Sequence, residues 1–352
     1  MKHIPQTKEE LQKLVKDLSI NLGDIDTSKI TDMSNLFYYT KRTDFSGIEK
    51  WNVSKVEKMY AMFYGAKAFN QDISGWDVSN VRDMAGMFED ATSFNQDLSN
   101  WNVGKVEYMN GMFFGARAFN QPIGDWNVGN VRNMIGMFKE AISFNQPIGK
   151  WNVSKVEDMS SMFEGAESFN QPIGDWDVSK VVDMINMFRE AESFNQDISK
   201  WDVSNVRDMF AMFKEAISFN QDISKWDVSN VWDMNYMFNG AISFNQDIGK
   251  WNVSNVKNMA GMFARAESFN ADISKWNVSK VWNMDGMFED AKSFNADISK
   301  WDVGNVKDMD SMFLGAKAFN QDLSNWDISG VEYINDETKD LISNGCNNVR
   351  RV

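Results

Sequence analysis

Cysteine and histidine are almost absent from this chain of 352 residues. Cys346 is the one cysteine and His3 the one histidine. A single thiol cannot form an internal disulfide or supply a thiolate cluster for a metal. One histidine near the N-terminus leaves no set of partners for a histidine-based triad or a histidine-ligated zinc. The composition therefore predicts no disulfide framework and no metal site, and we expect no cofactor.

Long apolar runs are also lacking. The opening residues, MKHIPQTKEELQKLVKDL, contain no apolar stretch as long as that of a signal peptide, and no later stretch is long enough to span a bilayer. The sequence thus favours a cytoplasmic protein over one whose leader has been removed, and it predicts no membrane insertion.

Positive charge is scarce as well, since the net charge is −14. An acidic chain repels phosphate backbones and anionic lipids, so we expect no nucleic-acid partner. The chain contains no GxSxG, P-loop or GxGxxG context, and its paired carboxylates recur with every repeat, so that none is singular. We therefore predict that the protein is not an enzyme. A polysaccharide-cleaving enzyme is the least favoured reading.

What the sequence does contain is one segment that repeats with a period of 25 residues. Asparagine, two phenylalanines and two methionines recur in this step, as in Asn70, Phe63, Phe69, Met59 and Met62. The tryptophans of the period are Trp51, Trp76, Trp101, Trp126, Trp151, Trp176, Trp201, Trp226, Trp251, Trp276, Trp301 and Trp326. An unbroken period of this length indicates one structural unit stacked on copies of itself.

Within the unit, the segment SNVRDMAGMFEDA places Val81, Met84, Met87 and Phe88 on one apolar stripe at helical spacing. We predict a short helix over residues 80–90, with the serine or glycine of the preceding position as its N-cap. Glycines recur at the end of this segment, where a positive φ is expected. They are Gly65, Gly115, Gly165, Gly240 and Gly315.

The segment ISGWDV predicts a short strand with Trp76 and Val78 on one face, and FNQD or FNQP forms the corner. Twelve exposed tryptophans would form an insoluble stripe, which favours a buried tryptophan spine over a sugar-stacking platform. Asn70 and its copies predict a ladder in which each side chain bonds the backbone of its own turn and of the next.

Both ends of the chain differ from the repeats and predict caps. Thr7 and Glu10 form a capping-box pair ahead of an amphipathic helix over residues 8–18, and DETKDLISNG predicts a closing helix. An open solenoid end would expose core, so such covers are expected. The expected division is an N-terminal helical cap over residues 1–24, a repeat solenoid over 25–334 and a C-terminal helical cap over 335–352.

The segments DISGWDVSNVRDMAGMF and AxSFNQDIS resemble the 25-residue repeat of the BspA-like leucine-rich-repeat surface proteins, in the subtype also seen in mycoplasma lipoproteins. The resemblance implies an α/β fold, a leucine-rich-repeat-like right-handed solenoid of about eleven to twelve strand-turn-helix units with helical end caps. It also implies a surface or secreted protein that acts in adhesion or protein binding, and it brings no catalytic residue.

Function is sought where the repeats differ, and aromatic residues interrupt a charged row in the second half of the chain. Trp232 and Tyr236 lie four apart and should point the same way on the predicted helix, with Phe210 on the preceding one and Trp282 two further on. Exposed aromatics mark binding surfaces. This patch predicts a site for a protein partner, with self-association and local packing as the alternatives.

The position before the tryptophan is lysine in five consecutive repeats, flanked by aspartates such as Asp222 and Asp227. The opposite charges favour a self-compensated surface ladder over a site for an acidic ligand. Aspartates this close to lysines, without a calcium-binding nonapeptide, do not favour calcium.

The sequence thus predicts a non-enzymatic, acidic repeat scaffold that binds another protein through its extended surface, in adhesion or host interaction. The alternative is an adhesin that binds glycan or extracellular matrix through the strand face. The sequence does not fix the oligomeric state. The expected partner-binding residues are Phe210, Trp232, Tyr236, Trp282, Lys200, Lys225, Lys250, Lys275 and Lys300.

Overall fold

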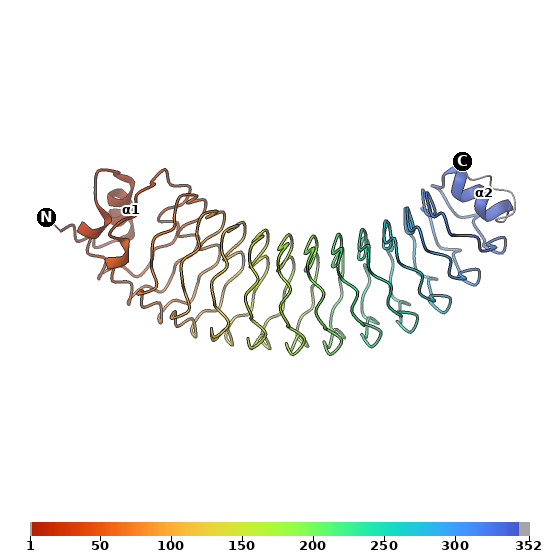
Figure 1. The fold of residues 1–352 in the computed structure, drawn as a ribbon, viewed down its shortest axis with the longest axis horizontal. Coiled ribbons are helices and arrows are strands. Elements are labelled where there is room, and N and C mark those ends of the chain that lie inside the picture. The colour runs from red at the N-terminus through yellow and green to blue at the C-terminus, as the bar shows by residue number, and fades with distance from the viewer. Residues whose placement is uncertain (1, 345–352) are drawn as a thin grey trace. The chain divides into compact units, whose positions relative to one another are not determined.

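The computed structural model describes residues 2–344, so Cys346 and the end of the predicted C-terminal cap lie outside the described residues. The chain divides into two compact units, Met1–Lys180 and Val181–Val352. The regular elements of the described part are α1 (Lys8–Lys16), the short 3-10 helices η1 (Leu22–Asp24) and η2 (Ile48–Lys50), and α2 (Asp336–Asn344). Figure 1 shows α1 at the N-terminal end, α2 at the C-terminal end, and a series of irregular coils in each unit.

Helix α1 begins as the sequence predicts and ends two residues earlier than expected. The Thr7 hydroxyl accepts a hydrogen bond from the Glu10 amide at 3.2 Å, while the Glu10 carboxylate accepts from the amide of Gln6. Leu11 and Val15 face the core. The helix thus covers the first coil through one apolar stripe and is capped at its start.

The buried Arg42 fastens the other end of α1 to the first coil. Its guanidinium donates to the carbonyl oxygens of Val15, Asp17 and Ile20 at 2.8–3.3 Å. These carbonyls lie at and just beyond the helix end, where no intrahelical partner remains. One buried cation therefore supplies the donors for the carbonyls of Val15 and Ile20, and it shares the Asp17 carbonyl with the amide of Ile20.

The prediction of a helix in every repeat is wrong. Between η2 and α2 the described residues contain no helix, and residue 83 and its equivalents form isolated parallel bridges with the same position in the next coil. Alternate amides along the segment donate to the next coil, as Met84, Gly86 and Phe88 do to Tyr108, Asn110 and Met112 at 2.9–3.0 Å. The amides between them close tight turns onto the carbonyl three residues earlier, as Met87 does to Met84 at 3.1 Å.

Two left-handed residues per repeat explain why no helix forms. The backbone has a positive φ at Gly86 and again at Asp90, and the equivalent residues of the other repeats share this conformation. A right-handed helix cannot continue through such a residue. The apolar spacing therefore belongs to successive tight turns, each bonded to the next coil. The positive φ expected at Gly65 is confirmed, at 66°.

The predicted strand at the tryptophan segment is also wrong, because residues 74–75 form a turn and the rest of 73–78 has no regular secondary structure and no bridge. The serine expected as an N-cap acts in a local turn instead. The amide of Ser79 donates to Asp77 Oδ1 at 3.1 Å, and the amide of Ser74 donates to Asp72 Oδ1 at 2.9 Å. Such aspartate-led turns replace the ladder bonds that a strand would have made.

The tryptophan spine is confirmed. Every tryptophan of the 25-residue row is buried, with 3–6% of its surface exposed. Within unit 1, the rings of Trp76 and Trp101 stack at 6.5 Å, and the indole N–H of Trp101 donates to the carbonyl of Ile73 at 3.1 Å. Phe88 and Phe94 stack at 4.0 Å beside it. The same pattern holds in unit 2, where Trp201 and Trp226 stack at 6.4 Å. The core is thus a stack of aromatic rings tied to the backbone by indole hydrogen bonds.

The asparagine ladder between successive turns is also confirmed. Asn70 Oδ1 accepts from the amide of Asn95 at 2.9 Å and from the side chain of Gln96 at 2.9 Å. In unit 2, Asn220 Oδ1 accepts from Asn245 and from Gln246 in the same way. The glutamine therefore shares the ladder with the asparagine and fills the surface between two coils.

Candidate functional site

The position before each bridge residue forms one row of exposed side chains along unit 2. Its backbone is continuous, because Trp232 donates to Arg207, Lys257 to Trp232, and Trp282 to Lys257 at 2.9–3.0 Å. Neighbours in such a row lie one strand spacing apart, about 4.8 Å. The two tryptophans are 45% and 48% exposed. We call Arg207, Trp232, Lys257, Trp282 and Lys307 the aromatic–basic row.

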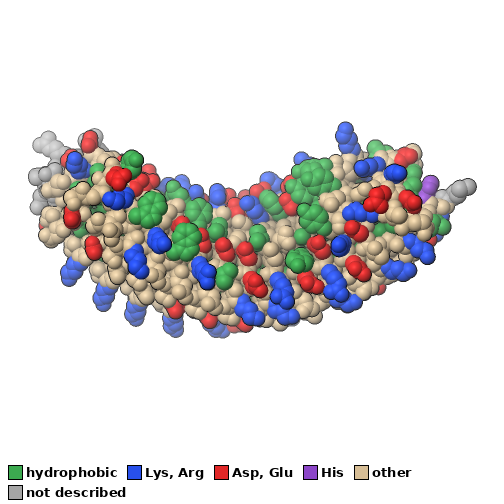
Figure 2. Space-filling view, turned by 180° about the vertical axis from the view of Figure 1, so that it is seen from behind, with side chains coloured by type: hydrophobic (Ala, Val, Ile, Leu, Met, Phe, Trp, Pro, Cys, Tyr) green, Lys and Arg blue, Asp and Glu red, His purple; other side chains and the backbone are tan. Residues whose placement is uncertain are grey.

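The cations of this row have few acidic partners. Lys307 lies 3.8 Å from Glu332, whereas Arg207 and Lys257 form no ion pair within 4 Å among residues 2–344. The chain as a whole is strongly acidic. The row is therefore a local band of aromatic and positive side chains, and Figure 2 shows exposed hydrophobic side chains among charged ones on one face of each unit.

Phe210 and Tyr236 come together in space, although the helix expected to carry Trp232 and Tyr236 and the preceding helix expected to carry Phe210 do not form. Their rings lie 6.2 Å apart edge to face, and the Lys214 ammonium lies 5.1 Å from the Tyr236 ring. Tyr236 has a φ of 57°, and its ring covers Gly261 so closely that a Cβ there would clash. Both aromatic side chains are half-buried. They form a packed cluster of adjacent coils, while Trp232 and Trp282 stand in the exposed row.

Unit 1 also contains an aromatic cluster, which consists mainly of tyrosines. Tyr64 contacts Tyr38 and Tyr39 at ring distances of 4.9 and 5.1 Å, and Tyr60 is 47% exposed. A hydrogen bond with Tyr39 and, to a smaller extent, burial raise the pKa of Tyr64. Phe114 lies under the Lys139 ammonium at 5.3 Å. These rings are therefore engaged mainly with one another and with neighbouring coils.

The five expected lysines, Lys200 to Lys300 in steps of 25, are exposed in unit 2. Their aspartate neighbours act first as turn caps. Hydrogen bonds from Ser224 lower the pKa of the Asp222 carboxyl, and the charge of Lys225 lowers it further. Asp297 is held in the same way by Ser299 and then by Lys300. The row is thus accompanied by carboxylates that stay ionised at neutral pH.

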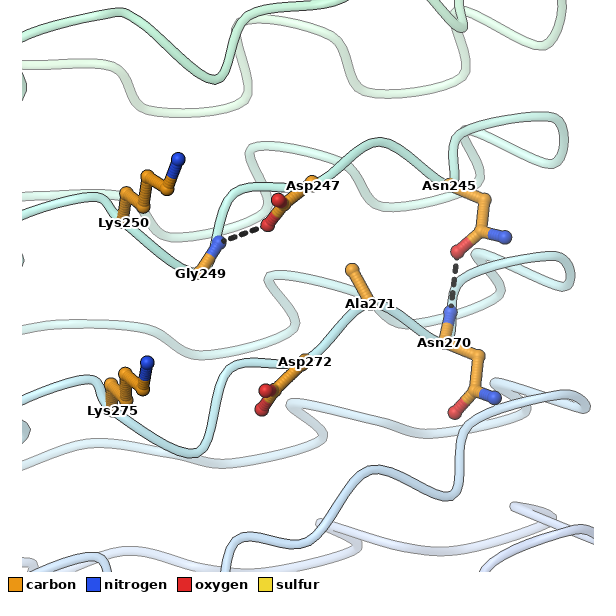
Figure 3. Close-up of a pocket in the computed structure, with 8 residues that line it drawn as sticks. All are labelled: Asn245, Asp247, Gly249, Lys250, Asn270, Ala271, Asp272 and Lys275. Carbon is orange, nitrogen blue, oxygen red and sulfur yellow. Dashed lines mark hydrogen bonds between the residues drawn. The ribbon is translucent and has the colours of Figure 1, made fainter.

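Two depressions between coils lie beside this lysine row, and sequence reasoning missed them. One of about 350 Å³ is lined by Asn245, Asp247, Ala271 and Lys275, among others, as Figure 3 shows. A second of about 390 Å³ follows around Ala296. The sequence does mark these depressions, because Ala271 and Ala296 occupy a position at which all the remaining repeats with the FN pair have glutamine.

A stack of carboxylates forms the bridge positions at the start of unit 2. Asp183, Asp208 and Asp233 pair through parallel bridges. Burial, and then the charges of the two flanking aspartates, raise the pKa of Asp208 to about 6, although its Oδ1 accepts a hydrogen bond from Phe210 at 2.9 Å. Burial also raises the pKa of Asp233. The middle carboxyl therefore takes up a proton in mildly acidic solution.

In the described part of the chain, no group of three or more histidine, cysteine, aspartate or glutamate side chains is placed to hold a metal ion. Over the same residues, no helix combines the length and apolarity that crossing a membrane requires.

Stacked coils, a sealed aromatic core and variable exposed rows define a repeat solenoid. The chain belongs to the family described as "Mycoplasma protein of unknown function, DUF285", whose model matches residues 8–121, 96–184, 171–270 and 243–345. No curated protein matches the chain in sequence.

Two solved structures show a faint likeness to the chain. One is a complex of TLR13 with ssRNA13, at 10% identity and a TM-score of 0.25 over 93% of this chain and 55% of that chain. The other is the functional domain of InlJ from Listeria monocytogenes, at 11% identity and a TM-score of 0.23 over 78% of this chain and 67% of that chain. The chain thus spans about half the length of the TLR13 chain. Likeness at this level carries no argument about fold or function.

Proposed function

We propose that the protein is a non-enzymatic scaffold that binds another protein through the aromatic–basic row of unit 2. The observation that carries this proposal is the exposure of Trp232 and Trp282, each close to half, on either side of Lys257. Tryptophan and arginine are the side chains most enriched in the energetic centres of protein interfaces. Large exposed aromatics in a row are otherwise rare on a soluble surface.

The charge of the row points to the chemistry of the partner. Arg207 and Lys257 lie between apolar anchors and form no ion pair within 4 Å in the described residues. A partner segment with carboxylates between apolar side chains would neutralise the cations while it covers the indoles. The resemblance to BspA-like surface proteins supports the same role and extends it to adhesion at a cell surface.

The test compares the wild type with a Trp232→Ala, Trp282→Ala double variant. Both are immobilised, captured proteins are ranked by the difference between the two, and the best candidate is purified and titrated. Each lost tryptophan anchor should weaken the dissociation constant at least tenfold, because an anchor of this kind contributes about 1.4 kcal/mol or more.

The matched control is Arg82→Ala with Arg132→Ala, which alters the equivalent row of unit 1. This variant should bind like the wild type. Sedimentation of the wild type and the double variant separates the alternatives, since a wild-type dimer that dissociates in the variant would show that the row binds a second copy instead. Equal titration curves for the wild type and the folded double variant would overturn the proposal.

A further inference from the structure

The glutamine that fills the surface between two coils is replaced by alanine in two consecutive repeats. Elsewhere in unit 2 this side chain donates to the asparagine of the preceding coil, as Gln246 does to Asn220 Oδ1 at 2.8 Å. At Ala271 and Ala296 no side chain is long enough to do so. The asparagine ladder does not require the change, because the amides of Asn270 and Asn295 donate to the side-chain oxygens of Asn245 and Asn270 as in the other repeats.

The missing glutamines leave room and free acceptors at the same place. Asn245 Oδ1 accepts only the amide of Asn270 at 2.8 Å, and Asn270 Oδ1 only the amide of Asn295 at 2.7 Å, among the hydrogen bonds of the described residues. An amide oxygen has two lone pairs. Each depression therefore has an unused acceptor on one wall, and Asp272 lines both depressions. Figure 3 shows Asn245 and Asp272 in the first of them.

The lining is polar and close to neutral. Asp247, Asp272 and Asp297 alternate with Lys250, Lys275 and Lys300 along the two depressions. The Asp272 carboxylate accepts from the amide of Ser274 at 3.0 Å and from the side chain of Ser274. Because a carboxylate offers about four lone-pair sites and Asp272 is exposed, it can accept further hydrogen bonds. The carboxylates repel an anion and the ammonium groups repel a cation. Hydroxyl groups, in contrast, can donate to the carboxylate and amide oxygens and accept from the ammonium.

The spacing of the two depressions selects between polymers. They repeat at one coil spacing, about 4.8 Å, whereas an extended peptide advances about 3.4 Å per residue. A peptide that runs along the coils would thus fall out of register between them. A linked pyranose ring advances by a distance similar to the coil spacing, so consecutive rings can meet equivalent groups.

We propose that the depressions at Ala271 and Ala296 form a binding site for an uncharged linear oligosaccharide that lies along the coils, with one sugar ring in each depression. The lysines and aspartates bind its hydroxyls from one side, and the asparagine oxygens bind them from the other. The site is independent of the aromatic–basic row and does not rest on protein binding there.

The test titrates the full chain with cello-, malto- and chito-oligosaccharides of one to six rings, by calorimetry and by ligand-observed NMR. Affinity for at least one series should rise from one ring to two and then level off, because there are two depressions. An Ala271→Gln, Ala296→Gln variant should lose at least tenfold in affinity. It should keep its thermal midpoint or raise it, because this glutamine is what the other repeats contain.

The matched variant is Gln246→Ala, which opens a third depression beside the first. It should extend the gain in affinity to a third ring. The Trp232→Ala, Trp282→Ala variant should bind sugar like the wild type, so that failure of one site is distinguishable from failure of the other. No binding to any of the neutral series, binding unaffected by the two glutamines, or a preference for uronic-acid oligomers that fades with salt would each overturn the proposal.

Discussion

The exposed position before each bridge residue forms a row in both units, but the two units fill this row with different side chains. In unit 1 it alternates in charge, and the ion pairs Arg82–Glu107 and Arg132–Glu157 span 3.3 and 4.0 Å. In unit 2 Trp232 and Trp282 stand at positions that alternate with the cations, and Glu332 is the carboxylate that remains, 3.8 Å from Lys307. The full row of unit 1 is Glu57, Arg82, Glu107, Arg132 and Glu157.

The backbone hydrogen bonds along this row are the same in both units. Glu107 donates to Arg82 at 2.8 Å in unit 1, and Lys257 donates to Trp232 at 2.9 Å in unit 2. Because both sets of side chains sit on one ladder, the row is not needed to specify the fold. Unit 1 pairs its charges within the row, whereas in unit 2 Arg207 and Lys257 form no ion pair in the described residues and the two indoles are exposed.

The largest effect should come from the core, equally in the two units. Trp101 and Trp226 are each 3% exposed, and their indoles donate to Ile73 and Ile198. Trp101→Ala and Trp226→Ala should each cost about 3–5 kcal/mol in the free energy of unfolding, measured with denaturant. The exposed Glu107→Ala should change it by about 0.5 kcal/mol or less. Costs that differ strongly between the two units would contradict a shared scaffold.

The outer end of unit 1 supplies the next effect. Replacing Arg42 by methionine keeps most of the buried volume but leaves the carbonyls of Val15 and Ile20 without donors. The loss should be about 1–3 kcal/mol, with faster amide exchange in α1. Lys41→Met, at the exposed neighbouring position, is the control and should have little effect. Unchanged exchange in the Arg42 variant would show that the clamp is dispensable.

The bridge positions, residue 83 and its equivalents, also differ between the two units. They hold acidic, basic, aromatic and amide side chains in unit 1, whereas unit 2 begins with three consecutive aspartates. The pKa of Asp208, the middle one, is about 6 against an ordinary 3.8. The native state therefore binds the proton more tightly than the unfolded state, so stability falls as pH rises from about 4 to 6.

Asp208→Asn should remove this loss. Asparagine occupies the equivalent position at Asn133 and Asn258, where its oxygen accepts the same turn bond. The variant should match the wild type below pH 4 and exceed it by roughly 1 kcal/mol above pH 7, after allowance for solvent screening. Parallel stability curves from pH 4 to 7 would contradict the raised pKa.

The smallest expected change in stability concerns the aromatic–basic row. Trp232→Glu with Trp282→Glu gives unit 2 the alternating pattern of unit 1. New pairs with Arg207 and Lys257 should contribute about 0.2–1 kcal/mol each at low salt and nothing measurable at high salt. A loss well beyond 1 kcal/mol would mean that the two indoles pack in the fold and are not held out for a partner.

Much of the fold could be predicted from the sequence, because it follows from side chains that recur without exception. The period, the buried tryptophans and the asparagine ladder each leave an unbroken row. The local conformation could not be predicted in this way. Met84, Met87 and Phe88 have the spacing of a helix, and the left-handed positions are hidden where Glu140 or Tyr236 occupies them instead of glycine.

Of the two candidate sites, one could be predicted from the sequence and the other could not. Trp232 and Trp282 interrupt a charged row, so the sequence shows them as exceptions. The depressions depend on a side chain that is missing, and the role of that glutamine became clear only from its bond to the neighbouring asparagine. Attention to broken rows as well as to unusual residues would have found Ala271 and Ala296.

The most direct test of the account is quenching of tryptophan fluorescence by acrylamide. Of the 14 tryptophans, Trp232 and Trp282 are exposed, and the twelve that remain are at most 6% exposed. The native wild type should show a small quenchable, red-shifted fraction, which disappears in Trp232→Phe, Trp282→Phe and returns for all indoles on unfolding. Strong quenching of the native double variant would show that water reaches the spine, and would contradict the stacked, sealed coils on which the account rests.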